Sequence, residues 1–111
     1  MSSPQQVRQI SVGELPPSPV ILDVREDDEW AAGHIDGAVH IPLADLPARL
    51  ADVPDADPLV VTCRSGGRSS QATAYLVGIA VEAVNLDGGM HAWHRAGRPM
   101  VSETGGTPEV I

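Results

Sequence analysis

The chain has 111 residues, a length typical of one domain with a modest hydrophobic core. Its 15 acidic and 7 basic side chains give a formal net charge of −8, which argues against binding to nucleic acid or to anionic membranes. The single cysteine excludes an internal disulfide and fits a reducing compartment, and no apolar stretch is long enough to span a membrane. Since residues 1–6 also lack the pattern of a signal peptide, we expect a cytoplasmic protein.

Short strands and helices alternate along the predicted domain. Val7 to Ile10 predicts a short strand, and the apolar run from Val20 to Val24 predicts a strand buried on both faces of a parallel sheet. An acidic helix, Asp27 to Ala32, is predicted to end at Gly33, with solvated carboxylates in its first turn. The remaining predicted elements are strands at 38–41, 59–62 and 83–86 and helices at 43–50, 69–80 and 90–96. This order indicates an α/β domain over residues 7–100, between a flexible N-terminus, 1–6, and a flexible tail, 101–111.

Cys63 ends an apolar strand and opens a glycine-rich loop that leads into a predicted helix. The loop residues are Arg64, Ser65, Gly66, Gly67 and Arg68, followed by Ser69. The two glycines permit positive φ, so up to five backbone N–H groups, together with the helix N-terminus, can converge on the sulfur. Because these amides and the two guanidiniums favour the thiolate, we predict that the pKa of Cys63 lies below the free-cysteine value of about 8.5. A buried, inert core cysteine is the alternative, but it explains neither the glycines nor the arginines.

The position of Cys63 also indicates where a ligand would bind. Ligands of open parallel sheets bind beyond the carboxyl ends of the strands, and Cys63 lies at such an end. Asp23 and Arg25, at the end of another predicted strand, would share this edge. A structural ion pair and a direct catalytic role are both open for these two residues.

Four segments carry a resemblance to a known family. They are Leu22-Asp23-Val24-Arg25 with Glu29-Trp30, Gly33-His34-Ile35-Asp36-Gly37-Ala38 with Ile41-Pro42, the loop from Cys63 to Ser69, and Asn85-Leu86-Asp87-Gly88-Gly89-Met90 with Ala92-Trp93. In order and spacing they resemble the motifs of rhodanese domains, sulfurtransferases in which the loop cysteine carries a persulfide. The resemblance covers roughly residues 7 to 100 and is specific to the family, not to one member.

The resemblance implies a rhodanese-like three-layer fold with a central, mainly parallel five-stranded sheet flanked by helices. It implies a catalytic Cys63, a loop from Arg64 to Ser69 that binds the substrate, and support of this loop by Asp23, with Arg25 beside it. The family's reaction moves sulfane sulfur from a donor such as thiosulfate to cyanide or a thiol through a persulfide, without a cofactor or a metal. Small thiols or thioredoxin-like proteins are the cellular acceptors that the resemblance makes plausible.

Other functions remain open for the same loop. A persulfide carrier or partner-binding module would receive sulfur from a dedicated protein and turn over free thiosulfate poorly. A cysteine phosphatase would use a similar amide cradle, but its loop has five residues between Cys and Arg, and this loop has four. An inactive interaction domain is disfavoured by the intact cysteine and cradle.

Three further features are expected to be structural. The spacing of His91 and His94 would allow both side chains to bind one metal ion, but we expect them to be surface histidines. His34 and His40 are expected to be structural. Trp30 and Trp93 are expected in the core or lining a pocket. Family members often have glycine where this chain has Ala80, which predicts a destabilised helix end if positive φ is required there.

Overall fold

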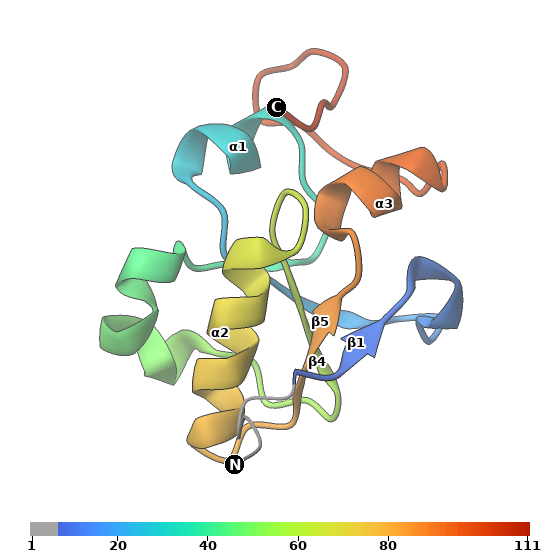
Figure 1. The fold of residues 1–111 in the computed structure, drawn as a ribbon. Coiled ribbons are helices and arrows are strands. Elements are labelled where there is room, and N and C mark those ends of the chain that lie inside the picture. The colour runs from blue at the N-terminus through green and yellow to red at the C-terminus, as the bar shows by residue number, and fades with distance from the viewer. Residues whose placement is uncertain (1–6) are drawn as a thin grey trace.

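Five parallel strands form the centre of the molecule in the computed structural model, which describes residues 7–111 (Figure 1). The strands are β1 (Gln9–Ile10), β2 (Val20–Asp23), β3 (Val39–His40), β4 (Leu59–Thr62) and β5 (Ala83–Leu86). Their order in the sheet is β1-β5-β4-β2-β3, and each neighbouring pair is parallel. The predicted parallel sheet is therefore confirmed, and the prediction for residues 1–6 lies outside the described residues.

Helices and their apolar side chains cover both faces of this sheet. On one face, α2 (Gly67–Gly78) and the 3₁₀ helix η2 (Leu43–Asp52) pack against β2 and β4 and form one core cluster. On the other face, α3 (Gly89–Arg95) contributes to a second cluster with the opposite side chains of the same strands. The 3₁₀ helix η1 (Val12–Glu14) precedes β2, and α1 (Asp27–Ala32) follows it. This arrangement confirms the predicted three-layer α/β fold.

Two helices differ from the sequence prediction in their extent or type. The segment predicted as a helix at 43–50 is a 3₁₀ helix that contains Pro47 and a non-helical residue, Arg49, because proline lacks the N–H that an α-helix needs. Helix α2 begins at Gly67, two residues before the predicted start, and Gly66 caps it with a φ of 117°. Helix propensity alone misses this start because glycine is a poor helix former.

Ala80 adopts the left-handed conformation, with a φ of 70°, just after α2. Its N–H donates to Val77 O and the N–H of Val81 donates to Leu76 O, so the turn depends on this strained residue. We expect Ala80→Gly to stabilise the protein by about 0.5–1 kcal/mol in chemical denaturation. The matched control is Ala51→Gly, at an exposed position of η2 where φ is not positive, and it is expected to destabilise. Equal effects of the two substitutions would contradict the assignment of strain to residue 80.

The C-terminal segment returns to α1 and lies along its end (Figure 1). Val101 forms an antiparallel bridge with His34, and the N–H groups of Glu103 and Glu109 donate to the carbonyls of Ala31 and Ala32, each at 2.9 Å. The flexibility expected for residues 101–111 stays a prediction, but the structure gives this segment defined partners.

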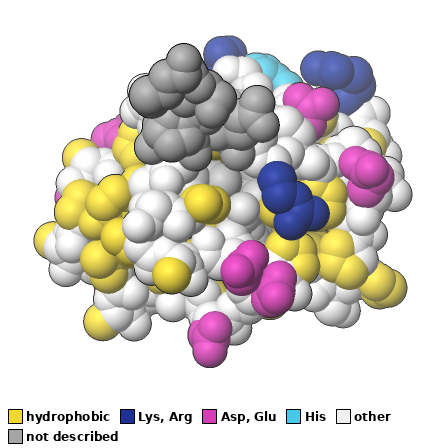
Figure 2. Space-filling model, turned by 60° about the horizontal axis from the view of Figure 1, so that its bottom comes forward, with side chains coloured by type: hydrophobic (Ala, Val, Ile, Leu, Met, Phe, Trp, Pro, Cys, Tyr) yellow, Lys and Arg dark blue, Asp and Glu magenta, His cyan; other side chains and the backbone are white. Residues whose placement is uncertain are grey.

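The surface carries the acidic excess of the composition. Figure 2, which brings the bottom of Figure 1 forward, shows acidic side chains distributed over the end of the molecule where the strands begin. No helix within residues 7–111 is both long and apolar enough to cross a membrane.

Candidate active site around Cys63

Cys63 follows β4, and its sulfur lies inside the loop that begins α2. The residue is only 1% exposed. The N–H of Gly66 donates to Sγ at 3.1 Å, and the hydroxyl of Ser69 donates to Sγ at 3.3 Å. These are the two shortest donors to the sulfur, and the N–H groups of Ser65 and Ser69 also point to it, so three backbone N–H groups surround it where the sequence allowed up to five.

The surroundings of the sulfur favour its ionised form. Burial, the largest single influence, raises the pKa of Cys63, but the hydroxyl and N–H of Ser69 and the N–H groups of Gly66 and Ser65 together outweigh it. The pKa of Cys63 is therefore lowered from its ordinary value, which confirms the predicted direction. A thiolate at this position is a stronger nucleophile than the thiol.

Removing the hydroxyl of Ser69 should weaken the thiolate. Ser69 is fully buried and makes the only side-chain hydrogen bond to Sγ among the described residues. We expect Ser69→Ala to raise the pKa of Cys63 and to slow its alkylation by iodoacetamide at neutral pH about threefold to tenfold. The control is Ser65→Ala, since the exposed Ser65 acts through its N–H, which alanine retains. An alkylation profile against pH that is the same for Ser69→Ala and wild type would contradict this assignment.

Arg68, at the end of the loop, forms a salt bridge with α1. Its guanidinium donates to both carboxylate oxygens of Glu29, at 2.7 and 2.9 Å. The hydrogen bonds from Arg68 lower the pKa of Glu29 to about 2 against an opposing effect of burial, and the pKa of Arg68 is raised in turn. The prediction that Glu29 is a solvated first-turn carboxylate is wrong, because its side chain faces the loop rather than water.

Asp23 and Arg25 form one fully buried ion pair at 2.7 Å. Arg25 also donates to the carbonyl oxygens of Glu29 and Gly33, at 3.3 and 2.8 Å. Arg25 therefore holds the C-terminal half of α1, the helix whose Glu29 binds Arg68. The geometry favours the structural alternative, in which Asp23 and Arg25 support the loop through α1 and not through contact with the sulfur.

Arg64 extends away from the loop and is exposed. Its Nε donates to the carbonyl oxygen of Ile111 at 2.9 Å, so the C-terminal segment reaches the residue next to Cys63. Gly67 begins α2 and leaves space around its Cα. The structure thus brings the predicted loop residues together, but gives the two arginines different partners.

Asn85 is a residue near the loop whose role the sequence analysis did not assign. It is 2% exposed, and its Nδ2 contacts Gly66 O at 3.4 Å, Ser70 Oγ at 3.1 Å and Gln9 Oε1 at 2.9 Å. It therefore links β5 and β1 to the first turn of α2. An amide inside an otherwise apolar strand was the signal that could have identified it.

The start of α3 closes the other side of the loop. The N–H of Met90 donates to Cys63 O at 2.8 Å, and the N–H of His91 donates to Arg64 O at 3.0 Å. A Cβ on Gly89 would lie 2.5 Å from Cys63 O, so only glycine permits this approach. Gly89 therefore allows α3 to pack directly against the backbone of Cys63 and Arg64.

The histidines are not arranged as a metal site. Trp30 stacks with His34 and with His40, at centroid distances of 3.6 and 4.7 Å, which supports a structural role for both histidines. Within residues 7–111, no cluster of three or more His, Cys, Asp or Glu side chains could hold a metal ion.

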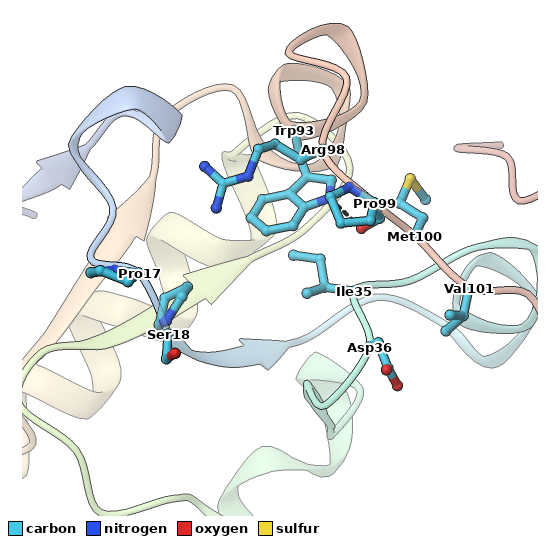
Figure 3. Close-up of a pocket in the computed structure, with 10 residues that line it drawn as sticks. Pro17, Ser18, Ile35, Asp36, Trp93, Arg98, Pro99, Met100 and Val101 are labelled. Atoms are coloured by element: carbon cyan, nitrogen blue, oxygen red, sulfur yellow. Dashed lines mark hydrogen bonds between the residues drawn. The ribbon is translucent and has the colours of Figure 1, made fainter.

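A pocket of about 460 Å³ is lined by residues outside the Cys63 loop (Figure 3). Trp93 and Ile35 line it, and the guanidinium of Arg98 lies 4.7 Å from the centroid of the Trp93 ring. The indole N–H donates to Pro99 O at 3.0 Å. This confirms Trp93 as a core and pocket-lining residue, but the pocket shares no residue with the loop.

Comparisons with known proteins agree with this geometry. Residues 3–96 match the model of the rhodanese-like domain. The chain is 40% identical to a sulfurtransferase of Allochromatium vinosum over 78% of this chain and 81% of the relative. It is 41% identical to the thiosulfate sulfurtransferase GlpE of Stutzerimonas stutzeri over 67% of this chain and 69% of that protein. A crystal structure of a rhodanese-related protein from Thermoplasma volcanium has a TM-score of 0.78 at 29% identity and covers 85% of this chain and 97% of its own. The chain therefore belongs to the rhodanese-like domain family.

Proposed function

We propose that this protein is a sulfurtransferase that moves sulfane sulfur from a donor such as thiosulfate to a thiophilic acceptor through a Cys63 persulfide. The observation that carries the proposal is the geometry of the single cysteine, whose buried sulfur accepts hydrogen bonds from Gly66 and Ser69 at the start of α2, an environment that favours the thiolate. Relatives named sulfurtransferase and thiosulfate sulfurtransferase support it. Cyanide serves as the assay acceptor, and a small thiol or a thioredoxin-like protein in the cytoplasm is the proposed natural one.

The proposed reaction has two displacement steps. The thiolate of Cys63 attacks the outer sulfur of thiosulfate, the S–S bond of the donor breaks, and sulfite leaves with the bonding electron pair. The terminal sulfur of the Cys63 persulfide then carries the negative charge, which the N–H and O–H donors of the loop stabilise without reorganisation. An acceptor nucleophile attacks this terminal sulfur and regenerates the thiolate.

Phosphate transfer is disfavoured by the same loop. Four residues separate Cys63 from Arg68. Arg68, the cation that would bind a phosphoryl group, is engaged by Glu29 through two hydrogen bonds. A carrier or partner-binding module that receives sulfur from another protein is the second candidate.

The test is intact-mass analysis of the protein after incubation with thiosulfate, combined with detection of thiocyanate after addition of cyanide. A gain of one sulfur atom that cyanide removes supports the proposed enzyme. Persulfide formation with a protein donor but not with thiosulfate would favour the carrier. Release of phosphate from an aryl phosphate above a Cys63→Ser blank would overturn the reaction class.

A further inference from the structure

Three guanidiniums lie at the edge of the sheet that carries Cys63, and each has a partner. Arg25 is paired with Asp23, and Arg68 is paired with Glu29. Arg64 is the one that extends from the loop toward solvent, and its Nε is bound to the carbonyl oxygen of Ile111. An anionic donor that approaches Cys63 therefore meets guanidiniums that already have acceptors.

The contact between Arg64 and Ile111 belongs to a longer packed segment. The indole N–H of Trp30 donates to the carboxylate of Glu103 at 3.0 Å, and Val110 packs against the second core cluster. The tail backbone at Glu109 packs directly against Gly33, where a Cβ would lie 2.6 Å from Glu109 O and 2.7 Å from Glu109 N. Its φ of 175° is extended, so the constraint on residue 33 is the space that the tail occupies and not the backbone conformation.

The tail changes the electrostatics at this edge. It occupies the Nε side of Arg64, and a carboxylate or sulfonate needs that side for a side-on pair of hydrogen bonds. It also brings Glu103 and Glu109 to the end of α1, on a chain with a formal net charge of −8. Both effects weaken the binding of a dianion near Arg64 more than the binding of a monoanion.

From these contacts we propose that the segment Glu109–Ile111 competes with anionic donors for Arg64, and thereby selects sulfane donors with at most one negative charge over the thiosulfate dianion. The donor class is that of organic thiosulfonates and persulfides. This inference rests on the proposed function and adds the charge of its donor. Displacement of the tail frees Arg64 and restores the binding of dianions.

The two donor classes follow the same balanced step. With thiosulfate, the Cys63 thiolate takes the outer sulfur and sulfite leaves as a dianion. With methanethiosulfonate, the thiolate takes the outer sulfur and methanesulfinate leaves as a monoanion. Both reactions form the same Cys63 persulfide, so the two donors differ at the site by one charge and by a methyl group in place of one oxygen.

The experiment compares the rates at which the two donors load sulfur onto Cys63, measured by intact mass, in wild type and in Gly33→Ala. We expect wild type to prefer methanethiosulfonate and Gly33→Ala to shift the preference toward thiosulfate about threefold to tenfold. In an Arg64→Ala background, Gly33→Ala should leave the preference unchanged. The control is Gly13→Ala, where an added Cβ meets nothing within 4 Å. Val110→Ser, which weakens the packing of the tail without a change of charge, replaces Gly33→Ala if that variant does not fold.

The outcomes separate this inference from the proposed function. If wild type loads both donors equally, or if the folded Gly33→Ala and Val110→Ser variants keep the wild-type preference, the competition for Arg64 is refuted. If no donor loads Cys63, the proposed function fails, and alkylation of Cys63 by anionic iodoacetate and neutral iodoacetamide still tests the contact. Displacement of the tail should then raise the ratio of the iodoacetate rate to the iodoacetamide rate, and an unchanged ratio would reject the inference.

Discussion

Cys63→Ser should abolish formation of the persulfide and reduce transfer of sulfur from thiosulfate to cyanide to the uncatalysed background. Serine has nearly the same shape, but its hydroxyl does not ionise near neutral pH and cannot accept a sulfane sulfur to form a persulfide. The N–H of Gly66 and the hydroxyl of Ser69 can still donate to the new oxygen, so the fold should be retained. The measurements are intact mass after incubation with the donor and colourimetric detection of thiocyanate.

The control for this variant is its thermal unfolding, which should match that of wild type because the loop keeps its hydrogen bonds. A variant that unfolds normally but still transfers sulfur at the wild-type rate would show that Cys63 is not the nucleophile. The chain has no second cysteine that could replace it.

Arg68→Ala should reduce both activity and stability. It removes two hydrogen bonds to Glu29 and leaves a largely buried carboxylate without its partner, at the contact that ties the loop to α1. Since the guanidinium is about one third exposed, solvent screens the pair, and we expect a loss of about 1–2 kcal/mol in the free energy of unfolding. Urea denaturation and thiosulfate kinetics of the same preparation measure the two effects.

The same ion pair predicts a dependence of stability on pH. Folding lowers the pKa of Glu29 from 4.5 to about 2, so its contribution is complete above pH 4.5 and is lost as the pH falls from 4.5 through about 2. Arg68→Ala should remove this contribution, and its stability should therefore decline less steeply than that of wild type across this interval. Parallel acid profiles of the two proteins would contradict the pairing.

Arg64→Ala provides the matched comparison at the other arginine of the loop. Its side chain is exposed, and its one hydrogen bond among the described residues is to the end of the tail, so stability should change little. Loss of this cation should raise the KM for thiosulfate, and added salt should have a similar effect on wild type by screening. Equal kinetic effects of Arg64→Ala and Arg68→Ala without a loss of stability would contradict this division of roles.

The sequence by itself determined the parallel α/β fold and the position of the proposed nucleophile. Apolar runs such as Val20 to Val24, separated by helical segments, are signals that local periodicity carries. Cys63 at a strand end, before two glycines and a helix, specifies where the sulfur lies relative to backbone N–H groups, since that geometry is local. The lowered pKa of Cys63 follows from the same few residues.

Tertiary structure alone decided the partners of the charged side chains. Glu29 and Arg68 are 39 residues apart, and Arg64 and Ile111 are 47 apart, so no local pattern could pair them. A first-turn carboxylate such as Glu29 is normally solvated, and only the packing of α1 beside the loop turns it inward. The path of the tail past Gly33 likewise depends on contacts between distant segments, which local periodicity does not encode. The proposed nucleophile could thus be identified from the sequence, whereas the charge that the proposed donor meets at the site depends on how the folded chain pairs its arginines.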